Sequence, residues 1–249
     1  MKTIAVEHSS TRQSKVLKIE WNMSKRCNFQ CSYCDELTSD RKSPHLSFDV
    51  AKKAIDKILS KTEDKQIKVN LTGGEPTVNP EFEKILSYMY ENNIDVGLIT
   101  NGSRTLEFYK GIMPKLKSFI MSYHMEYHNR EVLPDNILEL KKFIEENNYD
   151  IHFHIHMMML PTMFDEADRV ISMFKENNIP CVIRRIRPAY MKNDSAVYDT
   201  NGRLIEGEIA LPHYKGPVSL KLLPNGSPDY SYDEYYSLEE KQYLSNMGV

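Results

Sequence analysis

The clearest sign of the architecture lies in residues 66–76, which read QIKVNLTGGEP. Apolar and polar residues alternate along the first part of this stretch: Ile67, Val69 and Leu71 against Lys68, Asn70 and Thr72. Residues 150–157, DIHFHIHM, alternate in the same way, with three histidines among the polar members. Parallel strands covered by helices on both faces are nearly all apolar. One oily and one polar face instead predict a partial barrel, with helices on the oily face and a polar lumen that suits a polar ligand; a solvent-exposed sheet face is the alternative.

Apolar, β-branched runs alternate with helical patterns along the first three quarters of the chain, which is the βαβ signature. The expected strands are 16–22, 66–72, 95–100, 117–122, 150–157 and 181–186. The expected helices begin near Ser47, Pro80, Arg104, Asp135 and Thr162, with Asn79 and Pro80 as the cap and first residue of the second helix. The sequence therefore predicts an α/β fold, a partial (β/α)6 barrel of parallel strands.

Three similar triplets mark the ends of helices. Glu-Asn-Asn closes a helical pattern just before a strand at 91–93, 146–148 and 176–178. Asparagine tolerates the left-handed conformation that ends many helices. The sequence therefore predicts a left-handed stop at each triplet.

Length and charge exclude several classes of protein. The chain has 249 residues, 41% of them hydrophobic, and a net charge of -3, so it has enough apolar content for a large core and no basic field for nucleic acid. No apolar run approaches the roughly 18 residues that span a bilayer. Residues 1–14 are polar and lack the apolar region of a secretory signal. We expect a cytoplasmic protein without membrane or nucleic-acid partners.

The character of the chain changes beyond Pro188. Asn201-Gly202 indicates a tight β-hairpin, and eight of the fifteen tyrosines follow residue 188. We therefore expect an N-terminal segment at 1–15, the barrel at 16–188 and a short, tyrosine-rich C-terminal extension containing a β-hairpin at 189–249. The extension has three candidate roles: covering the barrel mouth, extending the sheet or binding a partner. The chain stops at Val249 without an obvious ending signal, which leaves room for a downstream domain.

Cysteine spacing points to metal ligation. Cys27, Cys31 and Cys34 fall within eight residues, while Cys181 lies far away, and this distribution does not suit a disulfide framework. Three thiolates in this spacing can each ligate one iron of a [4Fe-4S] cluster, which leaves the fourth iron open to a substrate. A zinc site is the alternative, with His45 as the nearest candidate for a fourth ligand.

At these cysteines and at Gly73-Gly74-Glu75 the sequence resembles the radical S-adenosylmethionine (SAM) superfamily, over roughly residues 16–188. The resemblance implies that the three cysteines hold a [4Fe-4S] cluster whose fourth iron binds SAM. It also implies a SAM site formed by seven residues: Tyr33 near the adenine, Gly73, Gly74 and Glu75 at the methionine amino group, Ser122 and His124 near the ribose, and Asn101 at the same rim. The family's glycine-rich adenine motif on strand five is replaced here by residues 152–159.

The remaining polar residues of the predicted lumen are substrate candidates. His154 and His156 are expected to line the chamber, and, because residues two apart on a flat strand diverge, not to share one metal ion. Arg185 and Arg187 share one face of strand six and Arg184 takes the other. Paired guanidinium groups bind carboxylate or phosphate well, so Arg185 and Arg187 predict an anionic substrate or a contact with the carboxylate of SAM itself; ion pairs that close the sheet edge are the alternative.

The resemblance implies an enzyme that reductively cleaves SAM to methionine and a 5′-deoxyadenosyl radical, which abstracts hydrogen from the substrate. A polar or anionic small metabolite, a nucleotide-like precursor and a peptide are all candidate substrates, and no side chain is assigned as catalytic. Such an enzyme requires a flavodoxin- or ferredoxin-like reductant. The alternative is an iron-sulfur or zinc protein that senses or transfers electrons without cleaving SAM.

Overall fold

The computed structural model describes residues 16–31, 33–34, 39–62, 65–128, 132–159, 163–185, 187–188, 197–198, 204–206 and 209–210. For Phe164, for Arg185 and for the short strands beyond, only the course of the backbone is described. Within these ranges, no helix is long and apolar enough to cross a membrane.

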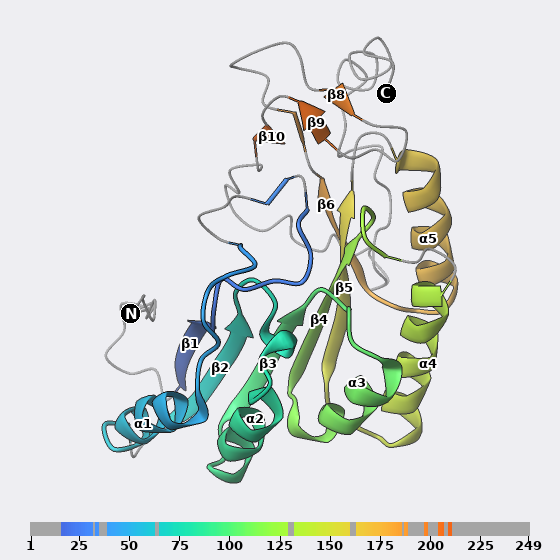
Figure 1. Ribbon diagram of the computed structural model, residues 1–249. Helices are drawn as coiled ribbons and strands as arrows, with labels where there is room; N and C mark the ends of the chain where they lie inside the picture. Colours follow the sequence, from blue (N-terminus) through green and yellow to red (C-terminus); the bar gives the residue numbers. More distant parts are fainter. Residues whose placement is uncertain are drawn as a thin grey trace. The chain divides into compact units, whose positions relative to one another are not determined.

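Six parallel strands form one open sheet in the order β1-β2-β3-β4-β5-β6, alternating with helices along the chain as in a partial (β/α)6 barrel. The strands are β1 (Val16–Asn22), β2 (Gln66–Thr72), β3 (Asp95–Thr100), β4 (Ser118–His124), β5 (His152–Met159) and β6 (Cys181–Arg185). The helices are α1 (Phe48–Leu59), α2 (Phe82–Glu91), α3 (Leu106–Ile112), α4 (Val132–Glu146) and α5 (Phe164–Glu176), with 3-10 turns η1 (Pro76–Val78) and η2 (Met113–Lys115) (Figure 1). The predicted α/β architecture is confirmed.

The described residues belong to two compact units. The first draws on Met1–Gln30, Asp35–Ile120 and Lys142–His152, and the second on Cys31–Cys34, Met121–Lys141 and Phe153–Val249. The first unit therefore carries β1 to β3 and the second carries β5 and β6.

In the first unit, β1 pairs with β2 and β2 with β3, all parallel. The alternation along β2 is confirmed, because Ile67, Val69 and Leu71 are buried while Lys68 and Asn70 are exposed. The polar face of this strand is thus available for polar contacts, which suits the predicted lumen better than a doubly covered sheet.

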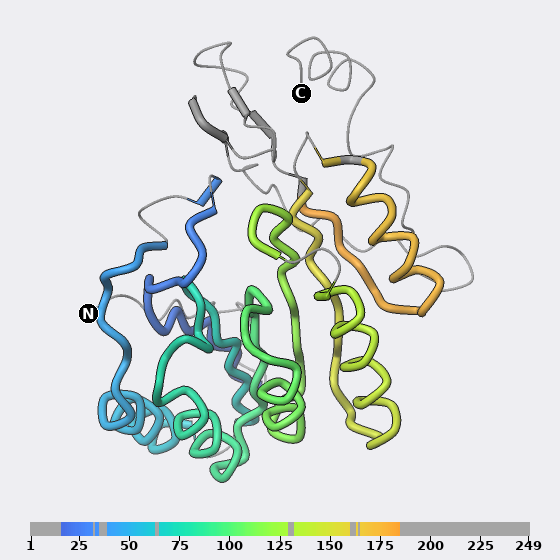
Figure 2. Tube along the Cα trace, turned by 45° about the vertical axis from the view of Figure 1, so that its right-hand side comes forward, coloured from blue at the N-terminus to red at the C-terminus, as the bar shows by residue number. Residues whose placement is uncertain are grey.

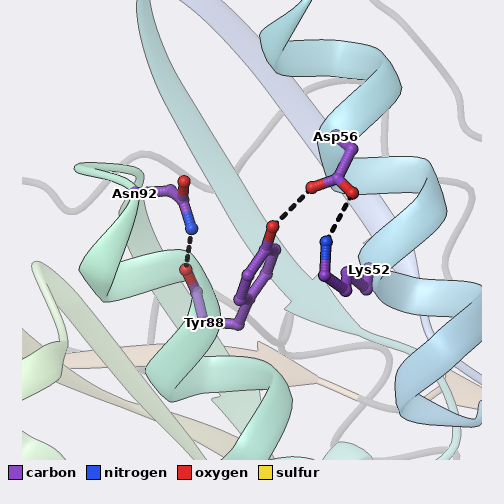
Figure 3. A network of polar contacts seen from close by, with 4 residues as sticks. All are labelled: Lys52, Asp56, Tyr88 and Asn92. Carbon is purple, nitrogen blue, oxygen red and sulfur yellow. Dashed lines mark hydrogen bonds and ion pairs between the residues drawn. The ribbon is translucent and has the colours of Figure 1, made fainter.

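Helices α1 and α2 lie side by side next to these strands (Figures 1 and 2). Asp56 joins them, since its carboxylate contacts Lys52 Nζ at 2.7 Å and accepts a hydrogen bond from the Tyr88 hydroxyl at 2.5 Å (Figure 3). Asn92 closes α2 by donating to the Tyr88 carbonyl at 2.8 Å. A polar network of this kind fixes the spacing of the two helices, because each bond contributes about 1 kcal/mol.

The predicted start of α2 was wrong by two residues. Pro76–Val78 forms the 3-10 turn η1, and the helix begins only at Phe82. Asn79 still accepts from the backbone N–H of Glu81 at 2.9 Å, but its amide also donates to the Leu46 carbonyl, which holds it outside the helix. By contrast, Ser47 caps α1 by accepting from the Val50 N–H, as predicted.

The three asparagine stops are confirmed. Asn93, Asn148 and Asn178 have φ angles of 57°, 52° and 54°, in the left-handed region. Each lies two residues beyond the last residue of a helix, and each is followed within four residues by a strand. Asparagine is one of the few residues other than glycine that adopts this conformation readily.

In the second unit, β5 pairs with β6 in parallel register, with Ile155 opposite Cys181 and Met157 opposite Ile183. Odd-numbered side chains of β5 are buried, whereas His154 and His156 are half-buried, so the predicted alternation holds here as well. Helix α5 lies against β6.

Two short antiparallel pairs follow in the C-terminal extension. β8 (Val197–Tyr198) pairs with β9 (Leu204–Glu206), and β7 (Arg187–Pro188) pairs with β10 (Ile209–Ala210). The first pair flanks the hairpin turn expected at 201–202, and the turn itself lies outside the described residues.

Candidate cluster and cofactor site

The loop that carries Cys27 follows β1 and is braced by a second segment of the first unit. The Cys27 N–H donates to the Asp40 carbonyl at 2.8 Å, and the Asp40 N–H donates to the Lys25 carbonyl at 2.8 Å. The Asp40 carboxylate in turn accepts from the backbone N–H groups of Lys42 and Ser43. Cys27 is therefore held by the backbone on both sides, and its side chain is only 9% exposed.

Two N–H groups approach the Cys27 sulfur. The Phe29 N–H lies 3.3 Å from Sγ, and the Asn101 side-chain amide lies 3.7 Å from it. Asn101 also donates to Asn28 Oδ1 at 2.9 Å. Donors to sulfur favour the thiolate over the thiol and tune iron–sulfur clusters, so this cysteine suits the role of an iron ligand.

Gly73-Gly74-Glu75 runs alongside the cysteine loop. The Gly74 N–H donates to the Ser24 carbonyl and the Glu75 N–H to the Arg26 carbonyl, both at 2.8 Å. A Cβ at Gly74 would lie 2.3 Å from the Lys25 carbonyl oxygen, and Gly73 has a φ of 137°. The glycines thus allow the chain to approach its own cysteine loop, which requires positions without a side chain.

The Glu75 carboxylate lies at the centre of a buried hydrogen-bond network. Its Oε1 accepts from the Thr77 N–H at 3.0 Å, from the Thr77 hydroxyl at 2.5 Å and from the Thr100 hydroxyl at 2.8 Å, while Oε2 accepts from the Asn101 N–H at 2.5 Å. Burial raises the pKa of Glu75, and these donors oppose the rise. Because Asn101 also contacts Cys27, the carboxylate links the end of β3 to the cysteine loop.

Sequence reasoning did not identify Thr77 and Thr100 as parts of this network. Both are buried, with exposures of 2%. Their positions carried a signal, since Thr77 lies two residues after Glu75 and Thr100 ends β3 next to Asn101. Hydroxyl side chains at such positions are the usual partners of a buried carboxylate.

In the second unit, Cys31, Tyr33 and Cys34 lie with His124, the last residue of β4. The Cys34 N–H donates to the Cys31 carbonyl at 3.0 Å, which closes a turn. The Tyr33 hydroxyl lies 2.7 Å from His124 Nδ1, and Cys31 Sγ lies 3.4 Å from the same nitrogen. The Tyr33 and His124 rings are stacked with their centroids 6.0 Å apart. His124 is thus brought to the cysteine turn rather than to open solvent.

The electrostatics of this turn follow from the two thiols. A hydrogen bond between them, with burial, raises the pKa of Cys31, and the same bond lowers the pKa of Cys34. Burial and the neighbouring His128 lower the pKa of His124 to about 3, so its ring is neutral near pH 7. A neutral imidazole and a polarised thiol pair suit a site where thiolates ligate metal.

The remaining expected site residues take separate positions. Ser122 is half-buried on β4, and its carbonyl contacts His128 Nε2 at 3.4 Å. His45, the candidate zinc ligand, instead contacts Arg26 Nη1 at 3.2 Å, and burial with that cation lowers its pKa. Among the residues that the structure describes, no three His, Cys, Asp or Glu side chains are already grouped to hold a metal ion.

The two histidines that were expected to line the substrate chamber differ from expectation in one respect. His154 and His156 were expected to diverge, but their Nε2 atoms lie 3.2 Å apart. Arg184 Nη2 lies 3.4 Å from His156 Nε2, so the arginine assigned to the opposite face from Arg185 joins the histidines. The side chains of Arg185 and Arg187 lie outside the described residues. The strand register places Arg184 on the histidine face, since Met158 pairs with Arg184.

The model of the radical SAM superfamily matches residues 21–186, more than half of the chain. The chain belongs to the radical SAM superfamily. The match contains all three clustered cysteines and the Gly73-Gly74-Glu75 segment. Membership implies SAM and an iron–sulfur cluster as cofactors. Relatives that match part of the chain, a mycofactocin maturase and a GTP 3',8-cyclase, carry the names of enzymes.

Curated relatives match only part of this radical SAM chain. The mycofactocin maturase MftC of Mycobacterium tuberculosis is 33% identical over 87 residues, which cover 34% of this chain and 21% of that protein. An S-adenosylmethionine-dependent nucleotide dehydratase of Selenomonas ruminantium is 30% identical over 89 residues, covering 36% of this chain and 31% of that protein. The chain thus spans less than a third of the length of these relatives.

Solved structures agree with the fold. SuiB of Streptococcus suis bound to S-adenosylmethionine superposes with a TM-score of 0.52 and 18% identity, covering 79% of this chain and 45% of SuiB. SuiB bound to its precursor peptide SuiA superposes with a TM-score of 0.51 and 19% identity, covering 68% of this chain and 39% of SuiB. At this identity the likeness shows the partial-barrel fold alone.

Proposed function

We propose that this protein reductively cleaves SAM at a [4Fe-4S] cluster held by Cys27, Cys31 and Cys34. The observation that carries the proposal is the pairing of Gly74 and Glu75 with the Ser24–Arg26 backbone, which places the glycine segment beside the loop that carries Cys27, the first cysteine of the motif. The N–H groups at the Cys27 sulfur and the thiol pair in the second unit further support thiolate ligands.

When held by Cys27, Cys31 and Cys34, such a cluster would supply the electron for cleaving the SAM sulfonium to methionine and a 5′-deoxyadenosyl radical, and this radical would take hydrogen from the substrate. The residues of the chain hold the proposed cluster and orient SAM. Asn101 and Phe29 stabilise the Cys27 thiolate. Tyr33, Ser122 and His124 are proposed to contact the adenosine of SAM.

Gly73, Gly74 and Glu75 are proposed to bind the methionine amino group. Since the Glu75 carboxylate already accepts four hydrogen bonds, the backbone of this segment has the freer acceptors. The Glu75 carboxylate then acts by holding the Gly73–Glu75 segment and Asn101 in position. Substitutions of Glu75 separate this positioning role from direct binding of SAM.

The proposed substrate is polar or anionic: a small metabolite, a nucleotide-like precursor or a peptide. The names of the relatives support both ends of this range, since one is a nucleotide dehydratase and SuiB was solved with a precursor peptide. A flavodoxin- or ferredoxin-like protein is the proposed reductant. The proposed compartment is the cytoplasm, where thiols stay reduced. Residues 16–188 are proposed as the catalytic domain, preceded by the 1–15 segment, with 189–249 as a separate extension.

The test is SAM cleavage by the anaerobically reconstituted protein with dithionite. We expect 5′-deoxyadenosine from the wild type and from Cys181→Ala, which removes a buried thiol far from the motif. Cys31→Ala should lose both the visible absorbance of the cluster and cleavage. Cleavage retained in Cys31→Ala would refute the ligand assignment. A wild type that binds iron or zinc but makes no 5′-deoxyadenosine would favour an electron-transfer or sensor protein.

A further inference from the structure

Strands β5 and β6 carry a polar cluster outside the residues proposed to bind SAM, with His156 and Arg184 in the carboxyl halves of their strands and His154 two residues before His156. Residues paired across parallel strands share a face, and His156 pairs with Val182 while Met158 pairs with Arg184. His154, His156 and Arg184 therefore share one face, and all three are half-buried. The opposite face is buried, with Ile155 and Ile183 at 0% and 2% exposure. In barrels of this kind, the carboxyl ends of the strands carry the chemistry.

Hydrogen-bond donors converge within this cluster. Arginine has no acceptor, so at 3.4 Å the Arg184 Nη2 donates to His156 Nε2. His156 Nε2 is then the acceptor, and His154 Nε2, 3.2 Å away, is the second donor. Two N–H donors from neighbouring strands thus point at one acceptor position.

The charge of the cluster selects the type of ligand. A guanidinium beside two imidazoles repels a metal cation, although two such nitrogens alone would suit one. Burial and the Arg184 charge lower the pKa of His156 to about 3, so the histidine is neutral and leaves the positive charge in place. A planar guanidinium with an adjacent N–H donor matches the geometry of a carboxylate or phosphate oxygen pair.

We propose that His154, His156 and Arg184 form a subsite that binds an oxyanion of the substrate, a carboxylate or phosphate group. On binding, the oxyanion replaces His156 Nε2 as the acceptor for Arg184 and His154, so the His156 ring turns aside to admit it. This inference rests on the proposed function, because it assigns the cluster to the substrate of that reaction. It moves the anion-binding role from Arg185 and Arg187 to Arg184.

The experiment is calorimetric titration of the anaerobically reconstituted full chain with inorganic phosphate and, separately, with acetate. We expect the wild type to bind at least one of them, and Arg184→Met to weaken that binding about tenfold or more, as loss of a charged partner does. Arg169→Met is the matched control, because Arg169 lies on exposed α5 and pairs with Glu166; it should keep the affinity within about twofold. His154→Gln keeps a side-chain N–H and should weaken binding less than Arg184→Met.

Arg184→Lys is a second variant that separates loss of the subsite from loss of the fold, since it keeps the positive charge and removes the planar guanidinium. We expect its affinity for the anion to lie between those of the wild type and Arg184→Met. Unchanged phosphate and acetate binding in Arg184→Met, or equal loss in Arg169→Met, would overturn the subsite. So would a loss confined to SAM affinity, which would assign Arg184 to the carboxylate of SAM. A protein that binds phosphate through Arg184 but makes no 5′-deoxyadenosine would overturn the proposed function and leave the subsite intact.

Discussion

Replacing Glu75 with alanine should destabilise the first unit strongly. The substitution leaves the Thr77 N–H, the Thr77 hydroxyl and the Asn101 N–H buried without an acceptor, while the Thr100 hydroxyl keeps the Tyr109 hydroxyl as a partner. An unsatisfied buried donor costs about 1–3 kcal/mol. Burial of the Glu75 carboxylate is itself unfavourable, as its raised pKa shows, so removing the carboxylate offsets part of the lost stability. We expect a net decrease of about 3–4 kcal/mol in the free energy of unfolding, near that of a broken buried ion pair.

Urea unfolding of the cluster-free protein measures this decrease. Trp21, the single tryptophan, is 7% exposed in β1 of the same unit and reports by fluorescence. Glu75→Gln keeps one acceptor oxygen and should lose about 1–3 kcal/mol. Glu83→Ala, on the exposed side of α2, is the control and should change stability by less than about 0.5 kcal/mol.

Cluster loading supplies the second readout for Glu75. Because Asn101 links Glu75 to Cys27, we expect Glu75→Ala to reconstitute with less iron than the control. If Glu75→Ala stays within about 1 kcal/mol of the wild type, loads iron fully and loses only SAM affinity, the carboxylate binds the ligand directly and the network argument is wrong.

Three further variants test other parts of the structure. Gly74→Ala should lower the free energy of unfolding by about 1–3 kcal/mol, because the added Cβ would lie 2.3 Å from a backbone carbonyl oxygen. Gly111→Ala is the control, because its Cβ would meet nothing within 4 Å, and it should be neutral or stabilising. Equal effects of the two substitutions would refute the close approach at Gly74. Tyr88→Phe should cost about 0.5–1.5 kcal/mol in urea unfolding by removing the bond to Asp56, and no loss would make that bond incidental. The pKa of His156 is depressed to about 3, so its contribution to stability is complete above pH 6.5 and falls by up to about 1.4 kcal/mol per pH unit below pH 6.5. His156→Gln should flatten this dependence of the free energy of unfolding on pH. An unchanged dependence between pH 7 and 5 would contradict the depressed pKa of His156.

The sequence predicted the strands and helix ends well where interactions between neighbouring residues decide them. The observed bounds of β1, β2 and β3 equal those expected from the sequence, and the left-handed φ of Asn93 and Asn178 agrees with the tolerance of asparagine for that conformation. The predicted boundaries of helices differed from the observed ones where tertiary contacts decide them. Pro80 looked like a first helical residue, but the preceding 3-10 turn postponed the helix.

The site was predictable in its residues and less so in their contacts. Spacing identified the cysteines, and motif order identified Glu75, but the partners of its carboxylate come from the end of β3, which sequence spacing does not reveal. The contact between Arg184 and His156 could not be predicted, because it depends on the register between β5 and β6. Register is set by the packing of both strands and not by either one.

The central claim is that the protein leaves one iron of the cluster open to SAM. Electron–nuclear double resonance on the reduced, reconstituted protein tests it directly, using SAM labelled with 15N at the amino group. We predict a 15N coupling to the cluster in the wild type and in Cys181→Ala. A fully formed cluster with bound SAM and no 15N coupling, or a single zinc ion in place of the cluster, would contradict the account.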